Sequence, residues 1–123
     1  MSKTLLIIED NEQNFYMMRF LLENKGFKVV GAENGRLGVE LALEHVPDAI
    51  LLDIQLPEMD GYAVAAELKK HAKLDKVPII AVTSYAMVGD REQILAAGAN
   101  GYIEKPINPD TFVEEIAQFV ARD

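Results

Sequence analysis

Short apolar runs alternate along the chain with longer segments in which apolar residues recur at helical spacing. The strands are predicted at residues 5–8, 27–32, 49–53 and 78–84, and a short fifth strand lies within residues 100–106. Three of them, LLII, AILL and PIIAV, are almost continuously apolar instead of alternating with polar residues. Strands of that kind are covered on both faces, as in the parallel sheets of α/β proteins. The pattern therefore predicts a parallel sheet buried between helices.

The segments between the apolar runs predict helices. Apolar residues at helical spacing mark the first two, namely Phe15, Met18, Leu21 and Leu22 in the first helix and Leu37, Leu41 and Val46 in the second. The second helix is expected to end before Pro47, since the residue preceding a proline avoids helical geometry. Residues 62–72, with the sequence YAVAAELKKHA, are expected to form the third helix.

End signals mark the last two helices. Gly98 is expected to cap the C-terminus of the fourth helix. Asn108 and Pro109 are expected to be the N-cap and the first residue of the last helix. The predicted inner face of that helix consists of Phe112, Ile116 and Phe119 or Val120.

Five strand–helix units in strict alternation define the fold class. They predict an α/β fold, namely a doubly wound five-stranded parallel sheet in a three-layer α/β/α sandwich. The expected topology is flavodoxin-like, with strand order 2-1-3-4-5. A chain of 123 residues fits one domain, which we expect to span residues 1–123.

Chemically versatile side chains follow four of the predicted strands. Strand one is followed by Glu9 and Asp10, strand three ends in Asp53, strand four in Thr83, and strand five in Lys105. Because functional groups gather at the carboxyl ends of strands in such sheets, we expect these side chains to meet at one edge.

Three carboxylates at one edge favour a bound cation. Two carboxylates about 4 Å apart repel by roughly 4 kcal/mol at an effective dielectric constant near 20. Either one carboxyl keeps its proton or a cation binds, and Mg²⁺ suits a few carboxylates plus water and phosphate oxygens. Glu9 and Asp10 are interpreted as acids on the metal side, and the turn after Asp53 offers the Gln55 backbone carbonyl as a further ligand.

Asp53 is the predicted nucleophile because it ends the central strand and precedes an irregular turn. A carboxylate that attacks a phosphoryl group forms an acyl phosphate. The ammonium group of Lys105 and the hydroxyl of Thr83 are expected to hold the remaining phosphoryl oxygens.

The whole pattern resembles the receiver domain of two-component response regulators. The matching pieces are IIEDN (7–11), LLDIQLPEMDG (51–61), IIAVTSYA (79–86) and YIEKP (102–106), in an order and spacing that cover essentially the entire chain. One departure is Glu9, where many members have aspartate.

The resemblance implies a role for each matching residue. Asp53 accepts a phosphoryl group from a phosphohistidine on a histidine kinase or a histidine phosphotransfer protein. Mg²⁺ is bound by Asp10, Asp53 and the Gln55 carbonyl, with Glu9 acting through water. Lys105 contacts the phosphoryl group and precedes a cis bond to Pro106, while Thr83 and Tyr102 form the switch.

The resemblance also implies how such a protein works. It assists its own phosphorylation and dephosphorylation but is the substrate of another enzyme. The sequence contains no output domain, so the chain is expected to be a stand-alone receiver that binds a downstream protein target, with a piece excised from a longer protein as the alternative. It is expected to be a monomer or a phosphorylation-dependent dimer.

Composition narrows the possible partners and locations. The formal net charge of −8 argues against direct nucleic-acid binding and against anionic membrane surfaces. Cysteine is absent, which excludes disulfides and thiolate metal sites. No segment resembles a signal peptide or is long enough to span a bilayer, so a cytoplasmic location is expected.

Simpler interpretations exist for the same residues. Glu9 and Asp10 fit the first turn of a helix, Thr83 and Ser84 fit a helix cap, and Tyr102 fits a packing residue. Tyr85 is interpreted as loop surface near the site. Glu58 and Asp60 are interpreted as turn residues rather than metal ligands.

Four other functions compete with the receiver interpretation. A flavin carrier needs a hydroxyl- and glycine-rich phosphate loop after strand one, where this chain has EDNEQN. A P-loop hydrolase needs the motif GxxxxGK[ST], which is absent. An aspartyl phosphatase usually has a second acid two residues after its nucleophile, where this chain has Gln55. A phosphorylation-independent interaction module with the same fold remains the alternative.

Overall fold

A computed structural model describes residues 3–56, 59–84 and 88–120. The strands are β1 (Thr4–Ile8), β2 (Lys28–Ala32), β3 (Ala49–Asp53), β4 (Ile79–Thr83) and β5 (Gly101–Glu104). The helices are α1 (Glu12–Asn24), α2 (Gly35–His45), α3 (Gly61–Lys69), α4 (Val88–Ala96) and α5 (Phe112–Ala117), with a short 3₁₀ turn η1 (Ala72–Leu74). The strands pair in parallel in the order β2-β1-β3-β4-β5, so the predicted fold class and topology are confirmed.

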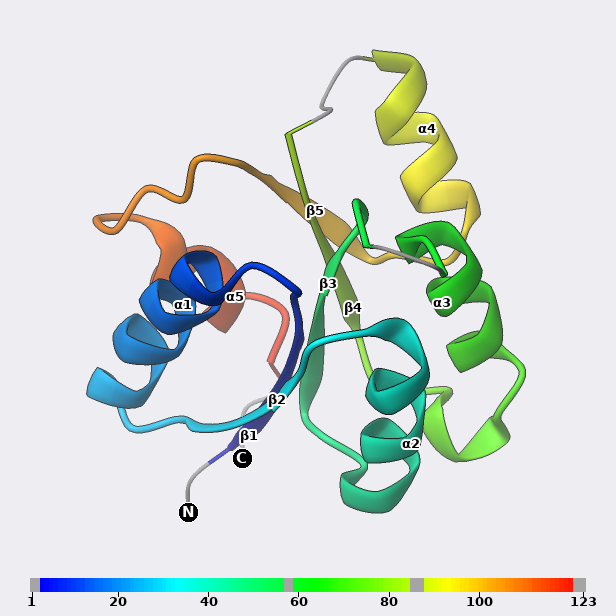
Figure 1. Ribbon diagram of the computed structural model, residues 1–123, viewed down its shortest axis with the longest axis horizontal. Helices are drawn as coiled ribbons and strands as arrows, with labels where there is room; N and C mark the ends of the chain where they lie inside the picture. Colours follow the sequence, from blue (N-terminus) through cyan, green and yellow to red (C-terminus); the bar gives the residue numbers. More distant parts are fainter. Residues whose placement is uncertain (1–2, 57–58, 85–87, 121–123) are drawn as a thin grey trace.

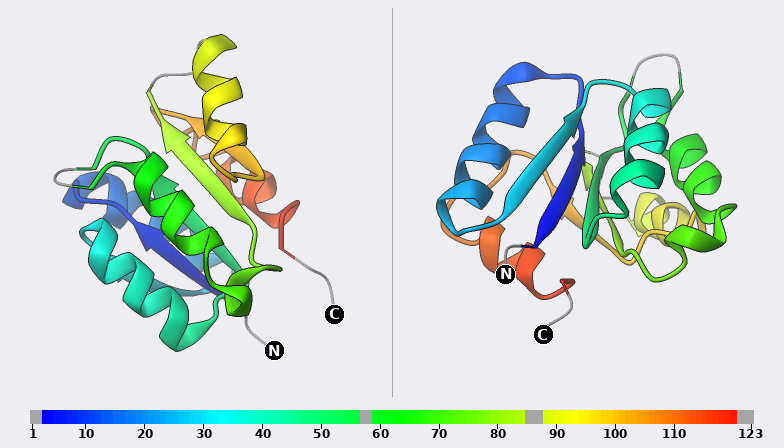
Figure 2. Two further views of the ribbon diagram at one scale, coloured as in Figure 1. Left: turned by 90° about the vertical axis from the view of Figure 1, so that its right-hand side faces the viewer. Right: turned by 90° about the horizontal axis from the view of Figure 1, so that it is seen from below.

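The sheet lies between two layers of helices. Helices α1 and α5 cover one face, and α2, α3 and α4 cover the other (Figure 1). Figure 2 shows α2, α3 and α4 following one another across that second face. Strands β1, β3 and β4 are buried almost throughout, as expected for strands covered on both sides.

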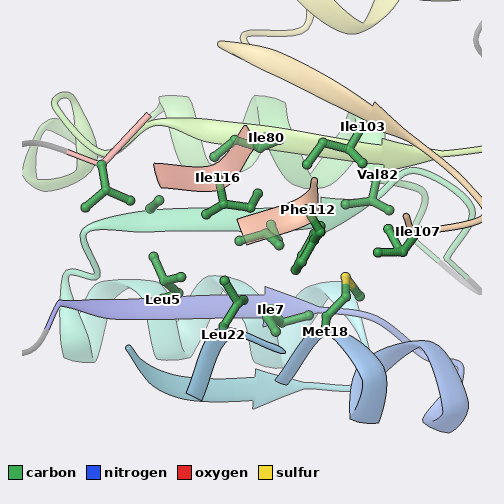
Figure 3. Packing of buried hydrophobic residues seen from close by; sticks show 13 residues of the cluster. Leu5, Ile7, Met18, Leu22, Ile80, Val82, Ile103, Ile107, Phe112 and Ile116 are labelled. Atoms are coloured by element: carbon green, nitrogen blue, oxygen red, sulfur yellow. The ribbon is translucent and has the colours of Figure 1, made fainter. Parts of the chain in front are cut away.

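Strand β1 contributes alternately to the two layers. Leu5 and Ile7 pack in the core beneath α1 and α5, whereas Leu6 and Ile8 pack in the core beneath α2 and α3. Figure 3 shows Phe112 and Ile116 of α5 reaching over the sheet in the first of these cores. Both side chains are fully buried, as predicted for the inner face of the last helix. The two cores thus lie on opposite faces of the same sheet.

Backbone caps define the helix ends. Asn11, Asn34 and Asp60 accept hydrogen bonds from backbone N–H groups at the starts of α1, α2 and α3. Gly98, with a φ of 112°, donates its N–H to the Leu95 carbonyl, and Ala99 donates to the Ile94 carbonyl. This pair of hydrogen bonds is a Schellman motif, so the predicted C-cap at Gly98 is confirmed.

Two predicted boundaries and the placement of Val46 were wrong, whereas α2 ends before Pro47 as predicted. Helix α5 begins at Phe112, because Asn108 and Pro109 open a separate turn in which the Asn108 side chain accepts from the Asp110 N–H. Helix α3 ends at Lys69 and not at residue 72, since the chain turns into η1 there. Val46, expected within the second helix, lies just beyond α2 as its left-handed C-cap and is 39% exposed.

Val46 carries backbone strain that a substitution should relieve. Its φ is 43°, a conformation that a β-branched side chain rarely adopts. We expect Val46→Gly to raise the free energy of unfolding by about 1 kcal/mol, because relief of strain exceeds the extra chain entropy of glycine. Urea denaturation measures the change. Val46→Ala is the control, since it keeps the strained φ; an equal gain from alanine would contradict the explanation.

Candidate phosphoacceptor site

The carboxyl ends of four strands deliver the predicted site residues to one edge of the sheet. Glu9 and Asp10 follow β1, Asp53 ends β3, Thr83 ends β4, and Lys105 follows β5. Glu9, Asp53 and Thr83 are the buried polar or charged residues of the described chain, with exposures of 3%, 2% and 0%. The edge predicted from the sequence therefore exists, and most of its polar side chains are shielded from water.

Asp53 occupies a fixed position. Its Oδ1 accepts a hydrogen bond from the Gln55 backbone N–H at 2.9 Å and lies 3.2 Å from Lys105 Nζ. The backbone behind it is closely packed, because a Cβ on Gly61 would lie 2.7 Å from the Asp53 carbonyl oxygen and 2.4 Å from Ile54 Cα. Only glycine fits there, so the start of α3 presses directly against the end of β3 and holds Asp53 in place.

Three carboxylates gather at this point. Glu9, Asp10 and Asp53 each offer an oxygen, and these oxygens lie within 4.8 Å of one another. Oε1 of Glu9 is buried without a hydrogen-bond partner among the described residues, although Lys105 Nζ lies 3.3 Å away. Asp10 is exposed, and together with Glu9 it lines a cavity of about 420 Å³ beside α1. An orphaned buried oxygen among three acids fits a hard cation such as Mg²⁺.

Lys105 is the cation that this structure places between the acids. Its side chain is 15% exposed, and its Nζ lies 3.3 Å from Glu9 and 3.2 Å from Asp53. The peptide bond between Lys105 and Pro106 is cis, the isomer that the family resemblance implies.

The pKa of Glu9 is raised from its usual value of 4.5 to about 7, chiefly by burial and also by the neighbouring Asp53 carboxyl. The Asn11 N–H and Lys105 act in the opposite direction and keep the pKa from rising higher. Near neutral pH and without a cation, Glu9 is therefore partly protonated, which limits repulsion between the acids.

The raised pKa makes stability depend on pH. Native Glu9 binds its proton more tightly than in the unfolded chain, where the pKa is 4.5, so this stabilisation is complete below pH 4.5 and is lost as pH rises through 7. With a chelator present, we expect the free energy of unfolding to fall by as much as about 3 kcal/mol across that window relative to Glu9→Gln. Urea titrations at several pH values measure the difference, and parallel curves for the two proteins would contradict it.

Gln55 and Ser84 connect the two loops that border the site. The Gln55 carboxamide oxygen accepts hydrogen bonds from the Ser84 hydroxyl at 3.0 Å and from the Ser84 N–H at 3.4 Å. The sequence indicated only helix capping for Ser84, and this contact with Gln55 was not expected.

Tyr102 on β5 lies near the site but points to the α4 side of the sheet. It packs against Ile54, Ala81 and Ile94, and the Arg91 guanidinium lies 5.3 Å from its ring centroid. Arg91 was not singled out from the sequence, although Arg91 and Ile94 are three residues apart and so share one face of α4.

The remaining nearby residues have simpler roles or are not described. Asp60 caps α3 by accepting from the Ala63 N–H, as its interpretation as a turn residue implies. The expectations for Glu58 and Tyr85 fall outside the described residues. No helix of the described segments is both long and apolar enough to cross a bilayer.

The sequence matches the response regulator receiver domain over residues 5–117. The chain belongs to this family. It is a receiver domain of two-component signalling and not a flavin carrier or a nucleotide hydrolase. Members of this family are phosphoacceptor switches that interact with histidine kinases and downstream targets.

Relatives agree with this assignment over nearly the full length. The receiver is 44% identical to the polar-differentiation response regulator DivK of Brucella anthropi, over 98% of both chains, and 43% identical to DivK of Brucella ovis with the same coverage. A putative response regulator from Chloroflexus aurantiacus superposes with a TM-score of 0.93 at 29% identity, covering 99% of this chain and 100% of that one.

A further relative concerns the metal. The receiver domain of a sensor histidine kinase from Pseudomonas aeruginosa PAO1 is 34% identical, has a TM-score of 0.88, and covers 97% of this chain and 98% of its own. That protein was solved with a magnesium ion coordinated in the active site cleft. The acidic cluster of this receiver has a donor set that fits the same ion.

Proposed function

We propose that this receiver, as one domain over residues 1–123, takes a phosphoryl group onto Asp53 from a phosphohistidine donor. The observation that carries the proposal is a buried carboxylate at the end of a central strand, fixed by the Gln55 N–H and by Lys105. Both contacts involve Oδ1, so we assign Oδ2 as the attacking oxygen.

The transfer is a displacement at phosphorus. A bond forms between Asp53 Oδ2 and phosphorus while the bond from phosphorus to the donor imidazole nitrogen breaks, and its electron pair stays on that nitrogen. Lys105 stands 3.2 Å from Asp53 and is placed to neutralise the incoming phosphoryl oxygens. The Thr83 hydroxyl at the end of β4 is assigned to the same oxygens. The same groups would assist the later attack of water on the acyl phosphate.

We assign the metal site to Asp10, Asp53, the Gln55 backbone carbonyl and, through water, Glu9. Mg²⁺ bound there would offset negative charge on the transferring group. Glu9 supports the assignment because its buried oxygen lacks a hydrogen-bond partner among the described residues and its carboxyl gives up a proton near neutral pH. Loss of that proton favours cation binding.

Thr83 and Tyr102 are the proposed switch. Thr83 would move towards the phosphoryl group and Tyr102 would turn inward, which repacks the surface formed by α4, β5 and α5. That surface would bind a downstream protein target in the cytoplasm, with the receiver acting as a monomer or as a phosphorylation-dependent dimer. The net charge of −8 argues against direct binding to nucleic acid.

The test is phosphorylation by a small donor. The protein is incubated with acetyl phosphate and Mg²⁺, and its intact mass is measured, with a chelator in a parallel sample. The proposal expects one phosphoryl adduct that requires Mg²⁺ and is removed by hydroxylamine, as an acyl phosphate is. Absence of an adduct, together with no transfer from phosphohistidine donors, would favour the phosphorylation-independent interaction module.

A further inference from the structure

Arg91 joins helix α4 to strand β5 through two contacts. Its guanidinium lies 5.3 Å from the centroid of the Tyr102 ring, within the range of a cation–π interaction. Its Nη2 also lies 3.4 Å from Glu104 Oε1. One side chain of α4 therefore contacts both Tyr102 and the residue that precedes Lys105.

The two contacts follow from the periods of the helix and the strand. Tyr102 and Glu104 are two residues apart on β5, so both face α4, whereas Ile103 packs in the opposite core with α5. Arg91 and Ile94 are three residues apart on α4 and share one face. Ile94 is buried against Tyr102, and Arg91 lies at the rim, where its side chain is 44% exposed. The guanidinium thus lies against a ring that is only partly buried at the edge of this cluster.

We infer that Arg91 is a positioning residue that holds Tyr102 in the arrangement described here and so opposes the movement of the switch. This inference rests on the proposed function of Tyr102. The cation–π contact needs the ring beneath the guanidinium, so turning the ring weakens or breaks it. An interaction that favours one of two arrangements lowers the affinity of any ligand that favours the other.

Beryllofluoride, added with Mg²⁺, is a stable substitute for the phosphoryl group on an aspartate. Its affinity for the receiver measures how strongly Arg91 opposes the movement of Tyr102. We expect Arg91→Ala to bind beryllofluoride about three- to tenfold more tightly than the wild type, the range for a half-exposed cation–π contact with an exposed ion pair. Glu104→Gln removes only the ion pair and should have less than half of that effect on a logarithmic scale. Arg91→Lys keeps the charge and should restore most of the wild-type affinity.

The resonances of the Arg91 side chain give a second readout. Protons over an aromatic ring are shifted upfield, so the Arg91 δ-protons should be shifted in the wild type and return to ordinary positions in Tyr102→Leu. Unchanged or weaker beryllofluoride binding by folded Arg91→Ala would overturn the inference. Chemical shifts of the Arg91 δ-protons that stay the same in Tyr102→Leu would overturn it as well. A wild type that binds no beryllofluoride would instead overturn the proposed function, and the inference with it.

Discussion

Asp53→Asn is expected to abolish uptake of a phosphoryl group from acetyl phosphate. An uncharged carboxamide is a far weaker nucleophile than a carboxylate, and it cannot form an acyl phosphate without losing its nitrogen. We expect a loss of at least about 10³-fold in the rate of adduct formation, measured by intact mass. The substitution keeps the size of the side chain and the acceptor for the Gln55 N–H, so the fold should be retained.

Asp60→Asn is the matched control. Asp60 caps α3 in the loop that follows Asp53, and asparagine caps a helix about as well as aspartate. This variant removes the same charge a short distance away and should take up phosphate like the wild type. An adduct on Asp53→Asn with unchanged stoichiometry would show that another side chain is the acceptor.

Lys105→Ala is expected to have opposite effects on phosphorylation and on metal binding. The ammonium group contacts both Glu9 and Asp53, and its removal deletes the positive charge that we propose neutralises the phosphoryl oxygens. Loss of one such group from a shielded site typically lowers a rate by about 10²–10³-fold. The three acids would then attract cations more strongly, so Mg²⁺ should bind up to about tenfold more tightly.

Stopped-flow phosphorylation by acetyl phosphate and calorimetric titration with Mg²⁺ separate the two effects. Lys73→Ala is the control, since Lys73 is exposed on η1, away from the acids, and should change neither quantity. If Lys105→Ala were phosphorylated at the normal rate, Lys105 would have no part in the transfer. If the Mg²⁺ affinity fell, Lys105 would support the cation site and not compete with it.

The architecture was predictable because the strongest sequence signal is also the main physical constraint. Runs such as LLII and AILL leave no polar face for water, so β1 and β3 had to lie between two layers of helices. The helix boundaries were less predictable. Asn108 and Pro109 favour a helix start, yet the chain uses them for a turn before α5 begins at Phe112.

The sequence predicted which residues gather at the site but not how their side chains contact one another. Parallel strands bring their ends together, which was enough to group Glu9, Asp53 and Lys105. The burial of Glu9 and its raised pKa depend on how the surrounding side chains fill space, which no local pattern encodes. The Arg91 contact depends on how α4 lies against β5. It combines the residue spacing of a helix with that of a strand, so neither pattern alone predicts it.

The side chains of β1 alternate between the two cores, and this ties the position of the acids to correct folding. Leu5 and Ile7 enter one core while Leu6 and Ile8 enter the other, and Glu9 continues the same strand direction. An insertion that shifts the C-terminal part of β1 by one residue would exchange its side chains between the two cores. It would also displace the acid pair by one position, so loss of the proposed cation site and disruption of the cores would occur together. Selection against misfolding should therefore remove such insertions and deletions in β1. The acids then keep their position at the end of the strand even without separate selection on phosphorylation.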